Sequence, residues 1–316
     1  MFTQDTTYNT LLDFMREFPD NDACRKHFEH IRWGDSPVCP HCGHDEKIYR
    51  LNGGKQLKCS ACRKKFSVLV GTFFENSNVG LHKWFLAIWL ATSHKKGISS
   101  CQLAKDIGVT QKTAWFMLHR IRGMLRDKEP ELLEGETEHD ETFIGGKEKW
   151  KHKNKRTPNS RGRSTKTKTP VFGMVQRGGP TRFSVVDDTR AETLQAEILP
   201  NVKPGSTVNT DEWVGYRGLD GLYNHEVIKH REDEYVRGTV HTNTIENRWS
   251  HFRRTLTGTY HHVSPKHLQR YADESAFRLS TFEMQEGERF DLSIAGCEGR
   301  LTYDELIHSR EWVTGT

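Results

Sequence analysis

The stretch Glu138-His-Asp-Glu-Thr-Phe-Ile-Gly-Gly146 carries acidic side chains on a β-strand pattern and ends on two glycines. Successive side chains of a strand point to opposite faces, so Asp140, Thr142 and Ile144 are predicted to share one face. Further short β-patterned runs, at residues 171–175 and 183–186, are separated by Gly or Pro. With a helical run at residues 191–199, these segments predict a mixed α/β zone from about residue 134 to residue 278.

Two more acidic residues in this zone lie next to predicted elements. Asp211, in Ser206-Thr-Val-Asn-Thr-Asp-Glu-Trp213, falls at the end of a strand that leads into a helix. Glu246 lies in a predicted helix, on which it shares one face with Arg253, two turns further on. We interpret the neighbouring Glu141 and Glu212 as solvated or salt-bridged residues.

Residues 99–126 have the pattern of a helix-turn-helix. Ser99 followed by Gln102 is typical of a capping box, Gly108 suits the left-handed end of a first helix, and Thr110 suits the cap of a second. One apolar face of the second helix is formed by Ala114, Met117, Leu118, Ile121 and Leu125. Side chains predicted to be exposed, and so to meet DNA phosphates or base edges, are Gln111, Lys112, Thr113 and Arg120. An ordinary helical hairpin is the alternative reading.

Two Cys-x-x-Cys pairs occur near the N-terminus, Cys39 with Cys42 and Cys59 with Cys62. Their separation is typical of a zinc ribbon, in which two tight turns direct four thiolates to one ion. Because cysteine fills all four positions, we expect one structural zinc and no open catalytic site. A redox pair is the competing interpretation, and His41 is read as a bystander.

Charge is distributed unevenly along the 316 residues, whose formal net charge is only +5. Residues 147–168 contain ten Lys and Arg against one acid, which predicts a flexible basic loop that contacts DNA. Its candidate DNA-binding residues are Lys151, Lys153, Lys155, Arg156, Arg161 and Arg163. No run approaches the ~18–20 apolar residues of a membrane-spanning helix, so a membrane protein is not expected.

The order of five motifs resembles that of DDE-type insertion-sequence transposases. These motifs are the Cys pairs, the helix-turn-helix, Asp-Glu-Thr-Phe-Ile-Gly-Gly, Thr-Asp-Glu and Asn-Thr-Ile-Glu-Asn-Arg-Trp-Ser. The similarity is to those transposases with an N-terminal zinc ribbon and an ISXO2-like catalytic domain, which are relatives of the Merlin transposases. It covers roughly residues 13–279. The resemblance implies an RNase H-like core, a mixed five-stranded sheet with flanking helices. It places Asp140 on the first strand, Asp211 after the fourth and Glu246 on a helix beside them.

The resemblance also implies a chemistry and a set of partners. Asp140, Asp211 and Glu246 would hold two Mg²⁺ or Mn²⁺ ions, and oxygen ligands suit such hard cations. The enzyme would bind the terminal inverted repeats of double-stranded transposon DNA, cleave there and join the 3′ ends to target DNA. We expect a homo-oligomer, at least a dimer, when it is assembled on DNA, and a cytoplasmic, nucleoid-associated location in a bacterial or archaeal host.

Two positions depart from the family pattern or stay ambiguous within it. The family commonly has Lys seven residues after the third acid, where this chain has Arg253, followed by Arg254. Arg also holds phosphate, with two parallel hydrogen bonds instead of a point charge. Some subgroups carry Asn as the third ligand, and Asn243 lies one turn before Glu246. We favour Glu246 and keep Asn243 as the alternative third ligand.

The fold class predicted overall is multidomain α+β. The expected domains are an N-terminal helix plus zinc ribbon at residues 1–76, a helix-turn-helix domain at 77–130, a catalytic domain at 131–280 and a polar C-terminal tail at 281–316. Two other functions stay open: a domesticated or regulatory DNA-binding protein without catalysis, and an RNase H-like nuclease without strand transfer. An intact set of three acids argues against the first, because a DNA-binding protein has no use for carboxylates facing phosphates.

Overall fold

The computed structural model describes residues 7–146, 151–158, 160, 164–229 and 236–308. Within them the chain folds into two compact units. We call them the ribbon unit, which comprises the described residues up to Arg126 together with Glu283–His308, and the sheet unit, which comprises those between Asp127 and Phe282. No helix among the described residues is long and apolar enough to cross a membrane.

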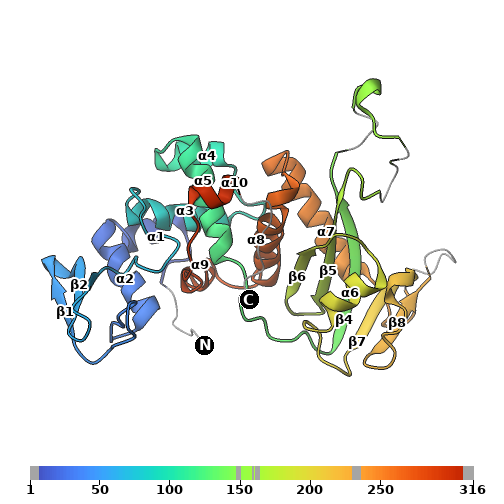
Figure 1. The fold of residues 1–316 in the computed structure, drawn as a ribbon, viewed down its shortest axis with the longest axis horizontal. Helices are drawn as coiled ribbons and strands as arrows, with labels where there is room; N and C mark the ends of the chain where they lie inside the picture. The colour runs from blue at the N-terminus through green and yellow to red at the C-terminus, as the bar shows by residue number, and fades with distance from the viewer. Residues whose placement is uncertain (1–6, 147–150, 159, 161–163, 230–235, 309–316) are drawn as a thin grey trace. The chain divides into compact units, whose positions relative to one another are not determined.

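The sheet unit is built on five strands in the order β6-β5-β4-β7-β8 (Figure 1). Strands β4, β5 and β6 pair antiparallel, whereas β4, β7 and β8 pair parallel, as predicted for a mixed sheet. The strands are β4 (Glu136–Ile144), β5 (Thr169–Gln176), β6 (Thr181–Val185), β7 (Thr207–Asp211) and β8 (Asn224–Ile228). The parallel pairs bring the carboxyl ends of β4, β7 and β8 to the same edge.

Helices cover both faces of this sheet. On one face Phe172 and Met174 of β5 pack with helix α6 (Ala191–Ile198) and the short helix η4 (Val214–Tyr216). On the other, Val171 and Val175 pack with helices α7 (Asn243–Thr255) and α8 (Leu268–Ser280). Consecutive residues of β5 thus enter two separate cores, which is why its sequence reads as a continuous apolar run. The remaining short elements of the unit are η3 (Lys153–Lys155), η6 (Leu256–Tyr260) and η7 (Pro265–His267).

The ribbon unit combines a three-stranded antiparallel sheet with seven helices among its described residues. The strands are β1 (Ile48–Leu51), β2 (Gln56–Cys59) and β3 (Lys65–Phe66), with η1 (Asn52–Gly54) between the first two. The helices are α1 (Leu11–Glu17), α2 (Asn21–Trp33), α3 (Leu81–Ser93), α4 (Ser100–Ile107), α5 (Gln111–Met124), α9 (Glu286–Ala295) and α10 (Tyr303–His308). Helix α3 buries apolar residues that recur at the helical spacing, namely Leu81, Trp84, Phe85, Ile88 and Trp89.

The prediction of a polar tail after residue 281 was wrong for the described residues. Helix α9 places Phe290, which is fully buried, among the rings of the N-terminal segment, with centroids 4.8 Å from Phe14 and 5.2 Å from Phe85. Asp291 accepts a hydrogen bond from Tyr8 at 2.6 Å and lies 2.7 Å from Nε2 of His27. The C-terminal helices therefore complete the core of the ribbon unit, because the N-terminal helices alone leave this aromatic cluster open.

Candidate active site and metal centre

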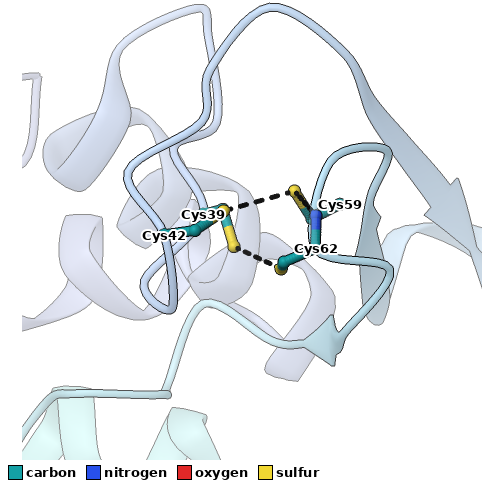
Figure 2. Close-up of side chains that lie close together, drawn as sticks. All are labelled: Cys39, Cys42, Cys59 and Cys62. Carbon is teal, nitrogen blue, oxygen red and sulfur yellow. Dashed lines mark hydrogen bonds between the residues drawn. The ribbon is translucent and has the colours of Figure 1, made fainter.

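The four predicted cysteines converge on one point of the ribbon (Figure 2). The Sγ atoms of Cys39 and Cys62 are 3.7 Å apart, as are those of Cys42 and Cys59, and all four lie within 4.8 Å of one another. Four thiolates around one tetrahedral zinc ion, each ~2.3 Å from it, stand about this far apart. The donor set therefore fits a structural zinc ion, which has no room for a further ligand.

Both turns that carry these cysteines are held by their own backbones. In the first, Gly43 donates to the carbonyl of Cys39 at 2.9 Å and has a φ of 74°, which favours glycine. In the second, the amide of Cys62 points to Sγ of Cys59 at 3.5 Å. His44 is not part of the cluster, and its Nε2 atom is 2.9 Å from the hydroxyl of Ser60. It ties the two turns together and is no ligand.

The helix-turn-helix forms as its local signals predicted. The Ser99 hydroxyl accepts from the amide of Gln102, Gly108 ends α4 in the left-handed conformation, and the Thr110 hydroxyl accepts from the amide of Thr113. Only half of the capping box is present, because the Gln102 side chain donates to Asp106 instead of reaching back. The predicted apolar face of α5 is buried throughout.

Arg120 is not exposed, contrary to the prediction. It is 7% exposed, and its guanidinium donates to the carbonyls of Leu301 at 3.0 Å and Glu75 at 3.2 Å. Burial lowers its pKa from the ordinary value. Since every residue from Met117 to Leu125 is buried, Arg120 is a structural residue and only the first turns of α5 reach the surface.

The other predicted DNA-binding residues of α5 lie in its first turn. Gln111 and Lys112 are exposed, and Thr113 is half-buried. Gln111 donates to the hydroxyl of Ser100, which joins α5 to α4. The ammonium of Lys112 lies 4.7 Å from the ring centre of Tyr303 in α10. The surface that the helix-turn-helix can offer to a groove is therefore small and centred on this turn.

The basic loop joins β4 to β5 in the sheet unit. Of its predicted DNA-binding residues, Lys151, Lys153, Lys155 and Arg156 are exposed. Arg161 and Arg163 lie outside the described residues. Arg254, at the end of α7, is exposed and donates to the Ser250 hydroxyl one turn earlier.

Asp140 and Asp211 lie on adjacent parallel strands. The paired register of these strands ends where Glu138 of β4 is opposite Asn209 of β7, and Asp140 and Asp211 each lie two residues further along their strand. Both carboxylates are half-buried, at the edge where the parallel strands end. Asp211 is fixed by the amide of Trp213, which donates to its Oδ1 at 2.9 Å.

A buried tyrosine lies close to both carboxylates. Tyr216 is 1% exposed and donates a short hydrogen bond to Glu141, which is itself buried. Of the two readings of Glu141, solvated or salt-bridged, burial rules out the first. Burial raises the pKa of this phenol well above its ordinary value, and the negative charges of Glu141, Asp140 and Asp211 raise it further. Tyr216 therefore stays protonated and keeps donating its hydrogen bond to Glu141.

Helix α7 carries Glu246 along the face of the sheet. Ile245 and Trp249 are buried against β5, so the adjacent Glu246 lies on the flank of the helix. At roughly 100° per residue, Glu246 and Arg253 occupy the same flank. Arg253 donates to the hydroxyl of Thr142 in β4, so this flank faces the strand that bears Asp140. Glu246, Asn243 and Arg253 are all exposed.

Three contacts hold α7 in register with β4. Nε1 of Trp249 donates to Oδ2 of Asp140 at 3.0 Å, and the Arg253 guanidinium donates to Thr142. At the start of the helix, the amides of Thr244 and Ile245 donate to the carboxylate of Glu138 at 2.7 and 3.0 Å. Two residues along the strand thus correspond to about one turn of the helix.

Sequence reasoning missed Glu138. It is fully buried, and besides the helix amides it accepts from the Thr244 hydroxyl at 2.9 Å and from Nε of Arg177 at 2.7 Å. The alternation that grouped Asp140 with Thr142 also includes Glu138, two residues earlier. That alternation was the signal in the sequence from which a role for Glu138 could have been predicted.

The acidic residues are spread more widely than the cysteines. Among the described residues, the only set of three or more metal-ligating side chains within 4.8 Å is the cysteine cluster. The structure therefore places Asp140, Asp211 and Glu246 on adjoining elements without bringing their oxygens that close together.

Comparison with known proteins gives two family matches and several relatives. The ISXO2-like transposase domain matches residues 132–280, and the transposase zinc-ribbon domain matches residues 19–65. An uncharacterized protein of the transposable element ISH50 from Halobacterium salinarum is 32% identical over 264 residues, which cover 80% of this chain and 88% of that protein. A transposase-like protein from Haemophilus influenzae is 29% identical over 102 residues, which cover 32% of this chain and 81% of that protein.

One similar solved structure is the crystal structure of a pre-cleavage Mos1 transpososome. It shares 12% identity with this chain, covering 65% of this chain and 75% of the solved one, with a TM-score of 0.26.

Proposed function

Because this chain belongs to the family of ISXO2-like transposases with an N-terminal zinc ribbon, we propose that it binds the inverted repeats of an insertion sequence, cleaves the DNA at the ends of the element and joins the 3′ ends to target DNA. The observation that carries the proposal is the placement of three acidic residues. In support, Asp140 lies on β4, Asp211 ends the neighbouring parallel strand β7, and Glu246 lies on α7, whose Arg253 donates to Thr142 of β4.

These three side chains suit hard divalent cations. All offer carboxylate oxygens, the ligands that Mg²⁺ and Mn²⁺ prefer. A two-ion site has ions about 3.5–4 Å apart, so its ligands span more space than those of a single ion. The wider spread of the carboxylates is compatible with such a site. When bound, the ions would activate the attacking hydroxyl and stabilise the leaving oxygen at phosphorus.

The chain's own residues would orient this chemistry. Trp249 donates to Oδ2 of Asp140 and the Trp213 amide donates to Oδ1 of Asp211, so both carboxylates are oriented by neighbouring donors. Arg253, tethered to Thr142 on the same flank as Glu246, is placed to hold a DNA phosphate, and Arg254 follows it.

DNA would be held by both units. In the ribbon unit we assign contacts to Gln111, Lys112 and Thr113, at the exposed start of α5. In the sheet unit we assign contacts to the basic loop, whose described Lys and Arg side chains are exposed. Since an element has two ends, we infer that at least two copies act together on DNA.

The test is to change each acid to its amide. Asp140→Asn, Asp211→Asn and Glu246→Gln should each abolish Mg²⁺-dependent cleavage and joining of end DNA while leaving its binding intact. The matched control is Glu192→Gln, because Glu192 is exposed on α6, on the opposite face of the sheet. Wild-type cleavage in any of the three variants would remove that residue from the site.

Asn243→Ala decides between the two candidate third ligands. Asn243 begins α7, one turn before Glu246. If Glu246 is the ligand, Asn243→Ala should cleave at close to the wild-type rate. The two other functions make different predictions: a DNA-binding protein without catalysis would show no metal-dependent cleavage, and a nuclease without strand transfer would cleave but never join.

A further inference from the structure

Helix α7 has no cap from its own N-terminal residue. Thr242 occupies the N-cap position, and threonine commonly accepts a hydrogen bond from the first turn, but its side chain makes no such bond here. The first-turn amides of Thr244 and Ile245 donate instead to Glu138, more than a hundred residues earlier in the chain. The helix is therefore capped by the strand on which it packs.

A local cap and a distant cap have different consequences. A side chain at the N-cap stabilises a helix wherever the helix lies, because the capping side chain moves together with the helix. Glu138 belongs to β4, so its bonds also determine where along the strand the helix begins. Glu246 follows Ile245 directly, in the same turn, and a shift of the first turn along β4 would move it by the same amount.

The cap is also rigid. Glu138 is fully buried and is paired with Arg177, whose guanidinium also donates to the carbonyls of Thr239 at 2.6 Å and His241 at 3.0 Å. Those carbonyls belong to the segment that enters α7. A buried carboxylate with this many donors is costly to disturb, since breaking the pair leaves an uncompensated charge. The strand, the entering segment and the first turn of the helix are therefore tied together through the Glu138–Arg177 pair.

We propose that Glu138 is a positioning residue for the phosphoryl-transfer site: by capping α7 from within β4, it sets the place of Glu246 relative to Asp140 and Asp211. This inference rests on the proposed function. Glu138 itself would touch neither metal nor DNA, because its oxygens are occupied by the helix, Thr244 and Arg177.

Two substitutions separate position from stability. Glu138→Asp keeps the charge but shortens the reach by about 1.5 Å. Glu138→Gln keeps the reach but removes the buried one of the two carboxylates that pair with Arg177, the other being Glu136. The matched control is Glu274→Gln in α8, because Glu274 is 1% exposed and is likewise bonded to an arginine, Arg278 at 2.5 Å.

The readouts are thermal unfolding, the Mg²⁺ concentration at half-maximal cleavage, and Mn²⁺ binding followed by the electron paramagnetic resonance of free Mn²⁺. The Mn²⁺ that still binds to the Asp140→Asn variant is subtracted, so that only binding that depends on Asp140 is counted. Glu138→Asp should weaken this binding, and raise the half-maximal Mg²⁺ concentration, by about 10-fold or more. Glu138→Gln should lose more thermal stability than metal affinity, and Glu274→Gln should lose stability alone.

Wild-type Mn²⁺ affinity in a folded Glu138→Asp variant would overturn the proposal. If that variant does not fold, Thr244→Val is the deciding variant, because it removes one donor to Glu138 and keeps the shape of the side chain. We expect a smaller loss of Mn²⁺ affinity in Thr244→Val, and the absence of any loss would overturn the proposal. Failure of the proposed function looks different: the wild-type chain itself would then show no metal-dependent cleavage.

Discussion

At Gly173 the strand β5 lies against two side chains of helix α7, and a methyl group there should separate the strand from the helix. A Cβ atom at Gly173 would lie 2.6 Å from Cη2 of Trp249 and 2.9 Å from Cδ1 of Ile245. Carbon atoms pack at about 3.5–4.0 Å, so in Gly173→Ala the indole must retreat by about 1 Å. It has little room to do so, since Trp249 is 3% exposed and stacks on Phe183 with ring centres 4.5 Å apart.

Such overpacking costs about 1–3 kcal/mol of folding free energy. For a unit of this size that corresponds to a fall in Tm of about 2–4 °C per kcal/mol. Catalysis should suffer more, because Trp249 holds Asp140 and its helix carries Glu246; a displacement of about 1 Å can cost ~100-fold in rate. Gly221→Ala is the control, because a Cβ at Gly221 meets nothing within 4 Å.

The assays are thermal unfolding and the rate of Mg²⁺-dependent cleavage of end DNA. In the double variant Gly173→Ala with Trp249→Phe, the ring atoms that clash are gone, so part of the lost stability should return. The cleavage rate should stay low, because phenylalanine cannot donate to Asp140. If Gly173→Ala melts and cleaves like the wild type, the packing of α7 on β5 does not set the geometry of the site.

Three further predictions concern the metal, the buried arginine and pH. Removing zinc with a chelator should unfold the ribbon, since binding and folding are coupled in such small units, and an unchanged circular dichroism spectrum would contradict the assignment. Arg120→Ala should lower the Tm, because it leaves the buried carbonyl of Leu301 and the part-buried carbonyl of Glu75 without their donor. Lys112→Ala should instead weaken DNA binding at an unchanged Tm. Thermal unfolding and a salt-dependent binding titration separate the two, and the reverse pattern would restore Arg120 to the DNA surface. Burial, with the charge of His225, lowers the pKa of His139 from 6.5 to about 3, so between these values the unfolded chain binds a proton that the folded chain does not. The free energy of unfolding should therefore fall as the pH drops below 6.5. Urea unfolding from pH 4.5 to 7.5 should show that this free energy depends less steeply on pH in His139→Gln than in the wild type. An unchanged slope would contradict the prediction.

The elements predicted correctly from sequence depend on contacts between near neighbours. Ser99 caps the amide of Gln102 and Thr110 that of Thr113, each three residues on. The zinc ribbon likewise follows from two turns of four residues. The mixed sheet was predicted only through the family resemblance, because the order of strands depends on pairings that no local pattern contains.

Phe290 illustrates a signal that was present but weak. Helix α9 buries Phe290 and Ile294, one turn apart, whereas Leu292 between them is 37% exposed. A spacing of four residues is the helical period, but two apolar residues give too short a stripe to distinguish a helix from a tail. What makes the segment helical is the aromatic cluster that it completes, and that cluster comes from the other end of the chain.

Arg120 and Glu138 were misjudged in opposite directions for the same physical reason. Arg120, on a predicted DNA-binding helix, was expected to be exposed, but its partners Glu75 and Leu301 are 45 and 181 residues away. Glu138 received no role, although it accepts from Thr244, 106 residues away. A charged side chain can serve a surface or satisfy buried groups, and only the distant partners decide which. Residue type and order were therefore enough to select Asp140, Asp211 and Glu246 as candidates, whereas the contacts that would position them become visible only when the strand and the helix are brought together.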